Sequence, residues 1–305
     1  MPAVDARSAI SLDSIIFATD FSAASQNAGL YASAISVYFG VGLVIAHAFT
    51  LVQAAIEVEA EKPLASQQRI NLNHELTLTA RMLNAGRGTS ETVLLDGDPR
   101  KVIPELAHHR SPAMVVLGTH GGGSIDRFVL GSTAEGILRH SSGPALTVGP
   151  NVNTLRAGAL SIRRILYATD CSAEAAHAAP VALALADAYS AELDVLHVVR
   201  SHKSDHPEQL RQLQEHFCGA VSAIIPPHAG QICEPHTFVS AGQPHTEILN
   251  HVKEREIDLL VLGLRRNTHL GMQNRTSGVF PIIIEAKCPV ITVAAGSSSS
   301  DHQVV

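Results

Sequence analysis

The sequence predicts an α/β fold made of two tandem, open, doubly wound sheets of the Rossmann-like kind, each with five mostly parallel strands. Short apolar runs alternate with helix-like segments, the whole pattern occurs twice, and 305 residues exceed the usual size of one domain. We expect domains at residues 1–150 and 151–305, the second with a disordered, serine-rich tail from about residue 296. Ligands of such sheets bind at the carboxyl ends of the strands.

The duplication is visible residue by residue. The segment I-F-A-T-D-F-S around Asp20 recurs as L-Y-A-T-D-C-S around Asp170, an offset of 150 residues. The G-x-P turn at Gly97 recurs at Gly242, an offset of 145 residues. The second copy is therefore slightly shorter between its second strand and this turn.

Each element of the first copy has a local signal. Short apolar runs predict strands at residues 15–18, 43–47, 93–95, 114–117 and 145–148. Helices are expected at residues 28–39, within 50–86, at 100–108 and after 132. Gly40 ends the first helix, Pro63 breaks the second, and Asp98 with Pro99 opens the third.

Composition excludes several classes of partner. Hydrophobic residues make up 46% and charged residues 16% of the chain, as in globular domains with buried cores. A net charge of -6 argues against a nucleic-acid partner, which requires a basic face. No apolar run is long enough to span a membrane, and the first residues lack a secretory pattern. The four cysteines form no C-x-x-C pair, which favours the cytoplasm, and no Cys/His cluster has zinc spacing, so no metal site is expected.

The candidate site centres on residues 118–133, which read G-T-H-G-G-G-S-I-D-R-F-V-L-G-S-T. The loop joins the end of an apolar strand to the start of a helix. Such a loop brings backbone amides and a helix N-terminus to an anion, and phosphate is the natural guest. The alternative is structural: the glycines form a turn, and Ser132 with Glu135 forms a capping box.

The spacing of the loop differs from two common phosphate motifs. It contains no G-x-x-x-x-G-K-[ST], and Asp126 interrupts a G-x-G-x-x-G pattern. It reads G-x-x-G, nine residues, then G-S, and thereby resembles the ATP-binding branch of the universal stress protein family. The flanks V-V-L-G-T-H-G and L-G-S-T-A-E-G-I-L-R-H-S-S-G-P-A-L-T-V are similar to that family too. The resemblance extends roughly over residues 12–149 and 162–294.

This resemblance implies a stress-response protein that binds ATP, ADP or AMP, with or without Mg²⁺. It implies that Asp20 contacts adenosine, that the backbone at Ala48 meets adenine, and that the loop holds ribose and phosphates. The implied nucleotide-binding positions are Asp20, Ala48, Leu117, Gly118, His120, Gly121, Gly131, Ser132 and Thr133. Asp20 could also cap the first helix, and both roles are compatible if Ser22 provides the cap.

The second copy departs from the pattern in its own loop, G-L-R-R. Arg266 replaces the second glycine, and Phe280 replaces the glutamate of the capping box. If the second glycine needs positive φ or close contact with the ligand, arginine there would be strained. We therefore expect the second copy to have lost or weakened nucleotide binding, although Arg265 and Arg266 could instead pair with phosphate.

Three functions remain open. The leading one is a non-enzymatic nucleotide-binding regulator with an unknown protein partner, since no P-loop lysine or water-activating group is evident. The second is a slow ATPase, with Asp126 holding Mg²⁺ and His120 near the phosphates. The third is a nucleotide-free scaffold.

The last strand of each copy would be an exposed sheet edge unless it were paired. Domains of the family typically pair through this strand, so residues 145–148 and 290–293 are expected to pair within the chain. A further homodimer is compatible with the sequence.

Overall fold

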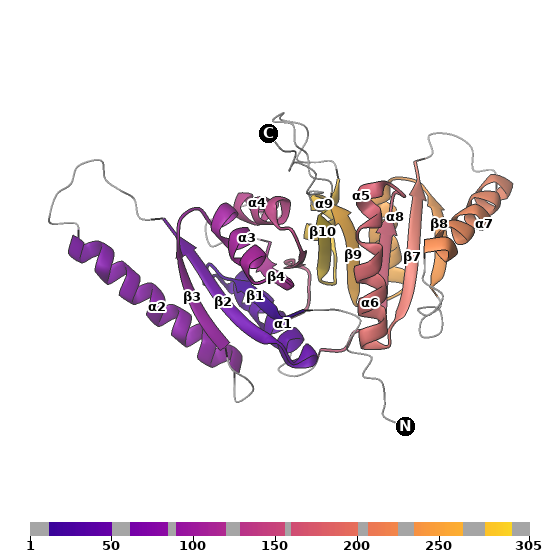
Figure 1. The fold of residues 1–305 in the computed structure, drawn as a ribbon. Coiled ribbons are helices and arrows are strands. Elements are labelled where there is room, and N and C mark those ends of the chain that lie inside the picture. The colour runs from indigo at the N-terminus through magenta and orange to yellow at the C-terminus, as the bar shows by residue number, and fades with distance from the viewer. Residues whose placement is uncertain are drawn as a thin grey trace, which may run out of the picture.

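The structure is a computed structural model. It describes residues 12–50, 62–84, 90–119, 129–155, 160–200, 207–224, 235–264 and 278–294. Two α/β halves lie side by side in it (Figure 1). The tail predicted from about residue 296 lies outside the described residues.

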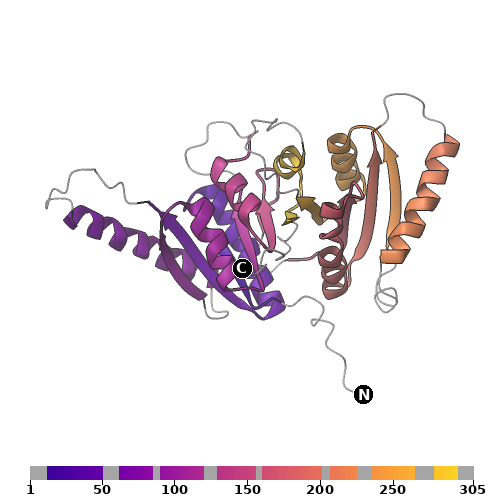
Figure 2. The same ribbon diagram turned by 45° about the horizontal axis from the view of Figure 1, so that its top comes forward.

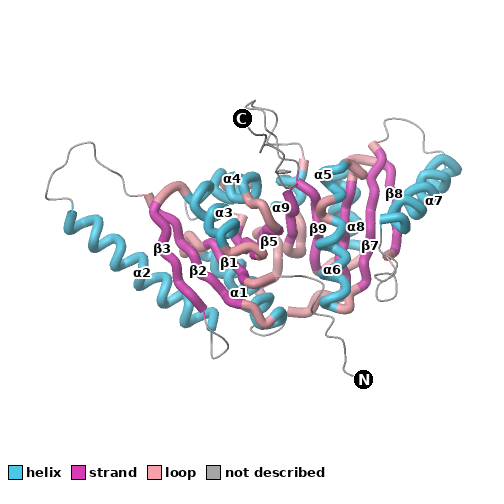
Figure 3. The backbone as a smooth tube through the Cα atoms, in the orientation of Figure 1, coloured by secondary structure: helices cyan, strands magenta, loops and turns pink. Residues whose placement is uncertain are grey.

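The described strands form one sheet in the order β3-β2-β1-β4-β5-β10-β9-β6-β7-β8 (Figure 3). The first half contributes β1 (Ser14–Ala18), β2 (Gly42–Phe49), β3 (Ser90–Asp96), β4 (Ala113–Gly118) and β5 (Pro144–Val148). The second contributes β6 (Arg164–Thr169), β7 (Glu192–Val199), β8 (His236–Ala241), β9 (Leu259–Leu264) and β10 (Val290–Ala294). Within each half all described pairs are parallel, which confirms the predicted α/β class.

Helices cover both faces of this sheet. The first half has α1 (Ala23–Phe39), α2 (Lys62–Asn84), α3 (Pro99–His109) and α4 (Ser132–His140). The second has α5 (Ala173–Ala176), α6 (Ala179–Tyr189), α7 (Pro207–Ile224), α8 (Pro244–Glu254) and α9 (Val279–Glu285). Leu76 of α2 and Phe217 of α7 belong to the core on one face, and Ile137 of α4 and Phe280 of α9 to the core on the other. Helices α2 and α7 lie at the two far ends of the molecule, beside the edge strands (Figures 1 and 2). None of the helices in these ranges is long and apolar enough to cross a membrane.

The two halves join through antiparallel pairing of β5 with β10, as expected from the edge strands. The buried Thr147 hydroxyl donates to the Val290 carbonyl across this junction at 3.0 Å. Beside it, the rings of Tyr38 and Tyr189 stack with centroids 4.3 Å apart, and the Tyr38 hydroxyl donates to the Ala188 carbonyl. The two predicted five-stranded sheets are therefore halves of one ten-stranded sheet.

The boundaries of the helices follow their local signals. Gly40 ends α1 in the left-handed region, at φ 67°, where a residue without a Cβ avoids strain. Asp98 caps α3 by accepting a hydrogen bond from the backbone amide two residues later. Pro63 is the second residue of α2, a position that needs no intrahelical N–H donor. The residues before Lys62, 51–61, lie outside the described ranges.

Candidate functional site

The candidate site lies where the strand order of the first half reverses. From β1 the chain proceeds through β2 to β3 on one side and then crosses to β4 on the other. Strands β1 and β4 are neighbours, with Ala18 opposite Leu117. Asp20 follows β1 and Gly118 ends β4, so both lie at the carboxyl edge of the sheet. This crevice is the usual ligand position in open α/β sheets.

Asp20 organises the turn between β1 and α1. Its Oδ1 accepts hydrogen bonds from the Ser22 amide at 3.1 Å and the Ser22 hydroxyl at 2.6 Å. Ser22 in turn caps α1, because its Oγ accepts from the Ser25 amide at 3.2 Å. The carboxylate of Asp20 is exposed. The N-cap of α1 is therefore Ser22 and not Asp20, and Asp20 supports the cap through its hydrogen bonds with Ser22.

Three further residues shape this turn, and their role was not predicted from the sequence. Phe21 has a φ of 63°, uncommon for a residue with a side chain. Its amide donates to Thr19 Oγ1 at 3.0 Å, and its ring lies 4.5 Å from that of His47. The Thr19 carbonyl oxygen lies 2.8 Å from His47 Nδ1. The duplication could have indicated this role, because Thr19 and His47 recur as Thr169 and His197, both at an offset of 150 residues.

Ala48 and Leu117, two further predicted site residues, lie near the carboxyl ends of β2 and β4. Ala48 is half-buried near the end of β2 and pairs with Leu95 of β3. The Leu117 side chain is buried in the core between the sheet and α4. Both are therefore placed to present main-chain groups, and not side chains, to a ligand at this edge.

Gly118 lies in tight contact with the first turn of α1, which gives this glycine a packing role whether or not a ligand binds. A Cβ built on it would lie 3.2 Å from the carbonyl carbon and oxygen of Ala24 and 3.3 Å from the Ser25 nitrogen. Those atoms belong to the first turn of α1, which comes closer to the strand end than a side chain would comfortably allow. The glycine lets the helix start approach the carboxyl edge.

The start of α4 differs from the predicted capping box. Gly131 is the N-cap, and no side chain among the described residues caps this helix. Ser132 is the first helical residue and is exposed, as is Thr133. Glu135 forms an ion pair at 2.9 Å with Arg139 one turn later instead of reaching back. The prediction is wrong because glutamate at this position serves equally well in an i,i+4 pair.

Gly131 also closes the base of the loop. Its amide donates to the Thr119 carbonyl at 3.0 Å, so the residues on either side of the central loop are joined. Its φ of -59° is open to any residue, so backbone conformation does not explain this glycine. The predicted site residues His120 and Gly121 lie outside the described residues, as do Asp126, Arg265 and Arg266.

The second half repeats the first turn. Asp170 Oδ1 accepts from the Ser172 amide at 3.0 Å, and Cys171 has a φ of 61°. The Cys171 amide donates to Thr169 Oγ1 at 3.0 Å, and His197 Nδ1 lies 3.0 Å from the Thr169 carbonyl oxygen. Every turn position that recurs in sequence therefore recurs in geometry.

The corresponding helix start is different. Helix α9 begins at Val279, two positions later than α4 by the offset, after Gly278 at a φ of 115°. Phe280, at the position of Glu135, is buried. The guanidinium of Arg139 from the first half lies over the Phe280 ring at 4.8 Å. The first turn of α9 therefore packs against the first half.

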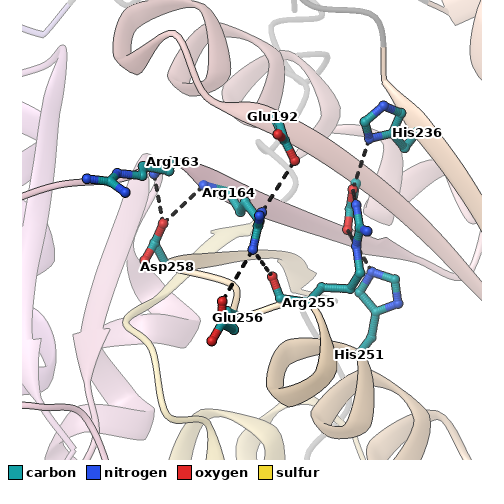
Figure 4. A network of polar contacts seen from close by, with 9 residues as sticks. Arg163, Arg164, Glu192, His236, His251, Arg255, Glu256 and Asp258 are labelled. Atoms are coloured by element: carbon teal, nitrogen blue, oxygen red, sulfur yellow. Dashed lines mark hydrogen bonds and ion pairs between the residues drawn. The ribbon is translucent and has the colours of Figure 1, made fainter.

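A second polar cluster lies in the second half, where β7 and β8 begin, at the edge of the sheet opposite the carboxyl ends of the strands. Figure 4 shows His236, His251 and Arg255 of this cluster. Asp194 of β7 is buried and lies 2.9 Å from His251 Nε2 and 3.0 Å from Arg255 Nε. Burial pushes the pKa of Asp194 upward, but the hydrogen bonds from His251 and Arg255 outweigh it and hold the pKa below its usual value. His236 lies at 3.5 Å on the exposed side. This cluster fastens α8 to the sheet. Throughout the described ranges, no three His, Cys, Asp or Glu side chains are grouped to hold a metal ion.

Comparison with known proteins identifies the family. The model of the universal stress protein family matches residues 12–149 and 161–294. Universal stress protein E of Escherichia coli K12 is 34% identical over 111 residues, which are 36% of this chain and 35% of that protein.

A solved universal stress protein of Archaeoglobus fulgidus DSM 4304 covers 94% of this chain and 97% of its own, at 23% identity and a TM-score of 0.68. One assigned to the same family from Pseudomonas aeruginosa UCBPP-PA14 covers 93% of each chain, at 15% identity and a TM-score of 0.55. The structures share the fold, and the two matches of the family model span most of the sequence. The chain belongs to the universal stress protein family, with two family units in tandem.

Proposed function

We propose that this protein binds one adenine nucleotide at the carboxyl edge of its first half and acts as a stress-response regulator without catalysing a reaction. The observation that carries the proposal is the start of α4. This helix begins beside the adjacent ends of β1 and β4, and no described side chain caps it. Helices α1 and α3 are capped by Ser22 and Asp98, whereas α6, α8 and α9 also begin without a side-chain cap. The position of the α4 start at this edge of the sheet therefore distinguishes it, and not the missing cap alone.

An uncapped helix start favours an anion. The first amides of a helix have no intrahelical acceptor, and the helix dipole is positive at this end. The exposed Ser132 and Thr133 add two hydroxyl donors at the same place. Phosphate groups suit such a set of donors. Gly118 keeps the neighbouring strand end free of a side chain.

The other side of the crevice suits adenosine. The exposed Asp20 carboxylate is oriented by its two hydrogen bonds from Ser22, which makes it a fixed acceptor for ribose or base. Ala48 places backbone groups at the end of the adjacent strand β2. The resemblance of both positions to the ATP-binding branch of the family supports this assignment.

The sequence favours binding over hydrolysis. It contains no P-loop lysine for a terminal phosphate. Asp20 is engaged with Ser22 and with the architecture of the turn, so we do not assign it as a base for water. Regulation through a protein partner, with nucleotide occupancy as the signal, is the function that remains.

The second half serves, in this proposal, as a structural partner. Its β6–α5 turn keeps the geometry of the first half, but its later helix start is occupied by the packing of Phe280 against Arg139. The occupied helix start and the G-L-R-R loop both support a single nucleotide site per chain.

The equivalent turn of the second half provides the control for a test of this proposal. Asp20→Ala and Asp170→Ala remove the same carboxylate from the same turn in the two halves. ATP binding to the full chain is measured by isothermal titration calorimetry. We expect Asp20→Ala to weaken binding at least tenfold and Asp170→Ala to leave it within twofold. Equal losses in both variants, or no loss in Asp20→Ala, would overturn the assignment.

A turnover assay separates regulator from enzyme. We expect no ATP hydrolysis above that of a buffer blank. Hydrolysis that disappears in Asp126→Ala but persists in an exposed control such as Glu105→Ala would establish a slow ATPase instead.

A further inference from the structure

An apolar pocket of about 220 Å³ opens in the second half, between one face of the sheet and helices α6 and α7. Figure 1 shows α6 beside β7 and α7 beside the edge strand β8. Most of its wall is aliphatic or aromatic, contributed by Ala179, Leu183, Leu193, Val195, Phe217 and Val221. Cys171, in the turn after β6, also lines the pocket and is exposed. The pocket therefore reaches solvent near the turn.

The polar groups in the wall are already bonded within the protein. The Tyr167 hydroxyl donates to the Ala175 carbonyl at 2.8 Å and is hydrogen-bonded to Thr169. Thr169 Oγ1 also accepts from the Cys171 amide. Burial, followed by the nearby Asp170 carboxylate, raises the pKa of the Cys171 thiol, so this thiol is neutral at pH 7. The described wall of the pocket therefore favours an uncharged ligand that needs no hydrogen bond from the protein.

The pocket differs from the equivalent region of the first half at one residue of the turn. Phe21 stands at the position of Cys171, with nearly the same backbone φ, 63° against 61°. The Phe21 ring packs against the core and lies 4.5 Å from the His47 ring. In the second half that ring is missing, and Phe217 of α7 approaches the corresponding His197 instead, with centroids 5.4 Å apart. The exchange of phenylalanine for cysteine removes an aromatic ring from the mouth of the pocket.

We propose that this pocket is a binding site for a compact, neutral, apolar molecule, a small aromatic or alicyclic hydrocarbon-like ligand. A dry cavity of roughly 150 Å³ accommodates benzene, so the present volume suits a ligand of about nine non-hydrogen atoms. Burial of such a ligand is favoured by removal of its apolar surface from water, without a hydrogen bond. The proposal concerns the second half only and is independent of the nucleotide site.

Naphthalene is the probe for this site. Binding to the full chain is followed by its fluorescence, with 2-naphthoate as the charged analogue of the same shape. We expect naphthalene to bind one site and naphthoate to bind at least tenfold more weakly, because the pocket offers no partner for a carboxylate. Equal binding of the two molecules would overturn the proposal.

The first half supplies the matched variants. Cys171→Phe restores the ring that the first half carries at the same φ, fills the mouth of the pocket, and should weaken naphthalene binding at least tenfold. Phe21→Cys makes the reverse change in the other half and should leave the second-half site unchanged. Undiminished binding in a folded Cys171→Phe protein, as judged by circular dichroism, would contradict the assignment.

A second measurement needs no variant. Naphthalene should slow the reaction of the Cys171 thiol with methyl methanethiosulfonate at least fivefold, as read by peptide mass spectrometry. Cys218 is exposed on α7 and does not line the pocket, so its reaction rate should not change. Protection of neither thiol, or of both equally, would place the bound probe elsewhere.

Discussion

The two halves of this molecule agree in one functional segment and differ in another. The turns after β1 and β6 share the hydrogen bonds to the aspartate, the threonine hydroxyl and the capping serine, and they share the same positive φ. The helix starts after β4 and β9 are not alike: neither is capped by a described side chain, but α9 begins two positions later than α4 and carries a buried aromatic ring in its first turn. The aspartate turn therefore has a folding role in both halves, and the helix start is where we propose that one half kept a nucleotide site and the other lost it.

The largest expected effect is on stability, at the position where the halves differ. Phe280→Ala removes a buried ring from the junction and should lower the free energy of unfolding by about 3–5 kcal/mol. The counterpart change, Glu135→Ala, removes a part-exposed ion pair and should cost only about 0.3–0.5 kcal/mol. Urea unfolding of both variants gives the comparison, and similar losses would show that the two positions have not diverged in role.

The next effect concerns binding. Gly121→Arg imitates Arg266 of the second half and should weaken ATP binding at least a hundredfold, or about 2.7 kcal/mol, because the proposed site assigns this glycine to the phosphate loop. Calorimetry measures the loss, and the unfolding midpoint should stay within a few degrees of the parent. Retained affinity would mean that the interpretation of both loops is wrong.

A smaller effect tests the polar cluster around Asp194 in the second half. Asp194 occupies the position of Val44, and Asp194→Asn should lower stability by about 1–3 kcal/mol at neutral pH. Since the pKa of Asp194 is lowered in the folded state, its contribution is complete above the unfolded pKa of about 3.9 and is lost as the pH falls through the folded pKa.

Unfolding curves between pH 5 and pH 2 should therefore bring parent and Asp194→Asn together at the acid end. Glu91→Gln, at the position of His236, alters a more exposed pair and should cost less than about 1 kcal/mol. A gap between parent and Asp194→Asn that widens on acidification would contradict the direction assigned to this pKa.

Removal of the helix caps should have the same effect in both halves. Ser22→Ala and Ser172→Ala each remove a helix N-cap in equivalent turns and should each cost about 1 kcal/mol. Thermal unfolding detects the change. A loss confined to one half would show that the two turns are not equivalent in energy, despite their shared geometry.

The sequence predicted the regular elements well, because each has a local cause. The apolar runs become strands, Gly40 ends α1, and Asp98 caps α3. The predicted capping box of Ser132 and Glu135 is wrong, because the S-x-x-E pattern does not indicate whether the Glu135 side chain points back to the cap or forward to Arg139. That choice depends on tertiary surroundings, which include the stacking of Arg139 on a ring from the other half.

The candidate site was predictable in position but not in detail. Strand ends placed Asp20 and Gly118 at one edge, as the structure has them. The close approach of α1 to Gly118 depends on contacts distant in sequence. The pocket beside Cys171 depends on α7, which packs there from far along the chain. The remaining information came from the duplication, because residues that recur at equivalent positions in both halves are those that the fold requires in each half.

The number of nucleotides per chain tests the central comparison most directly. The full-length protein is saturated with ATP and analysed by native mass spectrometry, with calorimetric stoichiometry as a check. A single intact site in the first half predicts one nucleotide per chain, lost in Asp20→Ala and kept in Asp170→Ala. Two nucleotides per chain would contradict the loss of the second site, and none would contradict the first.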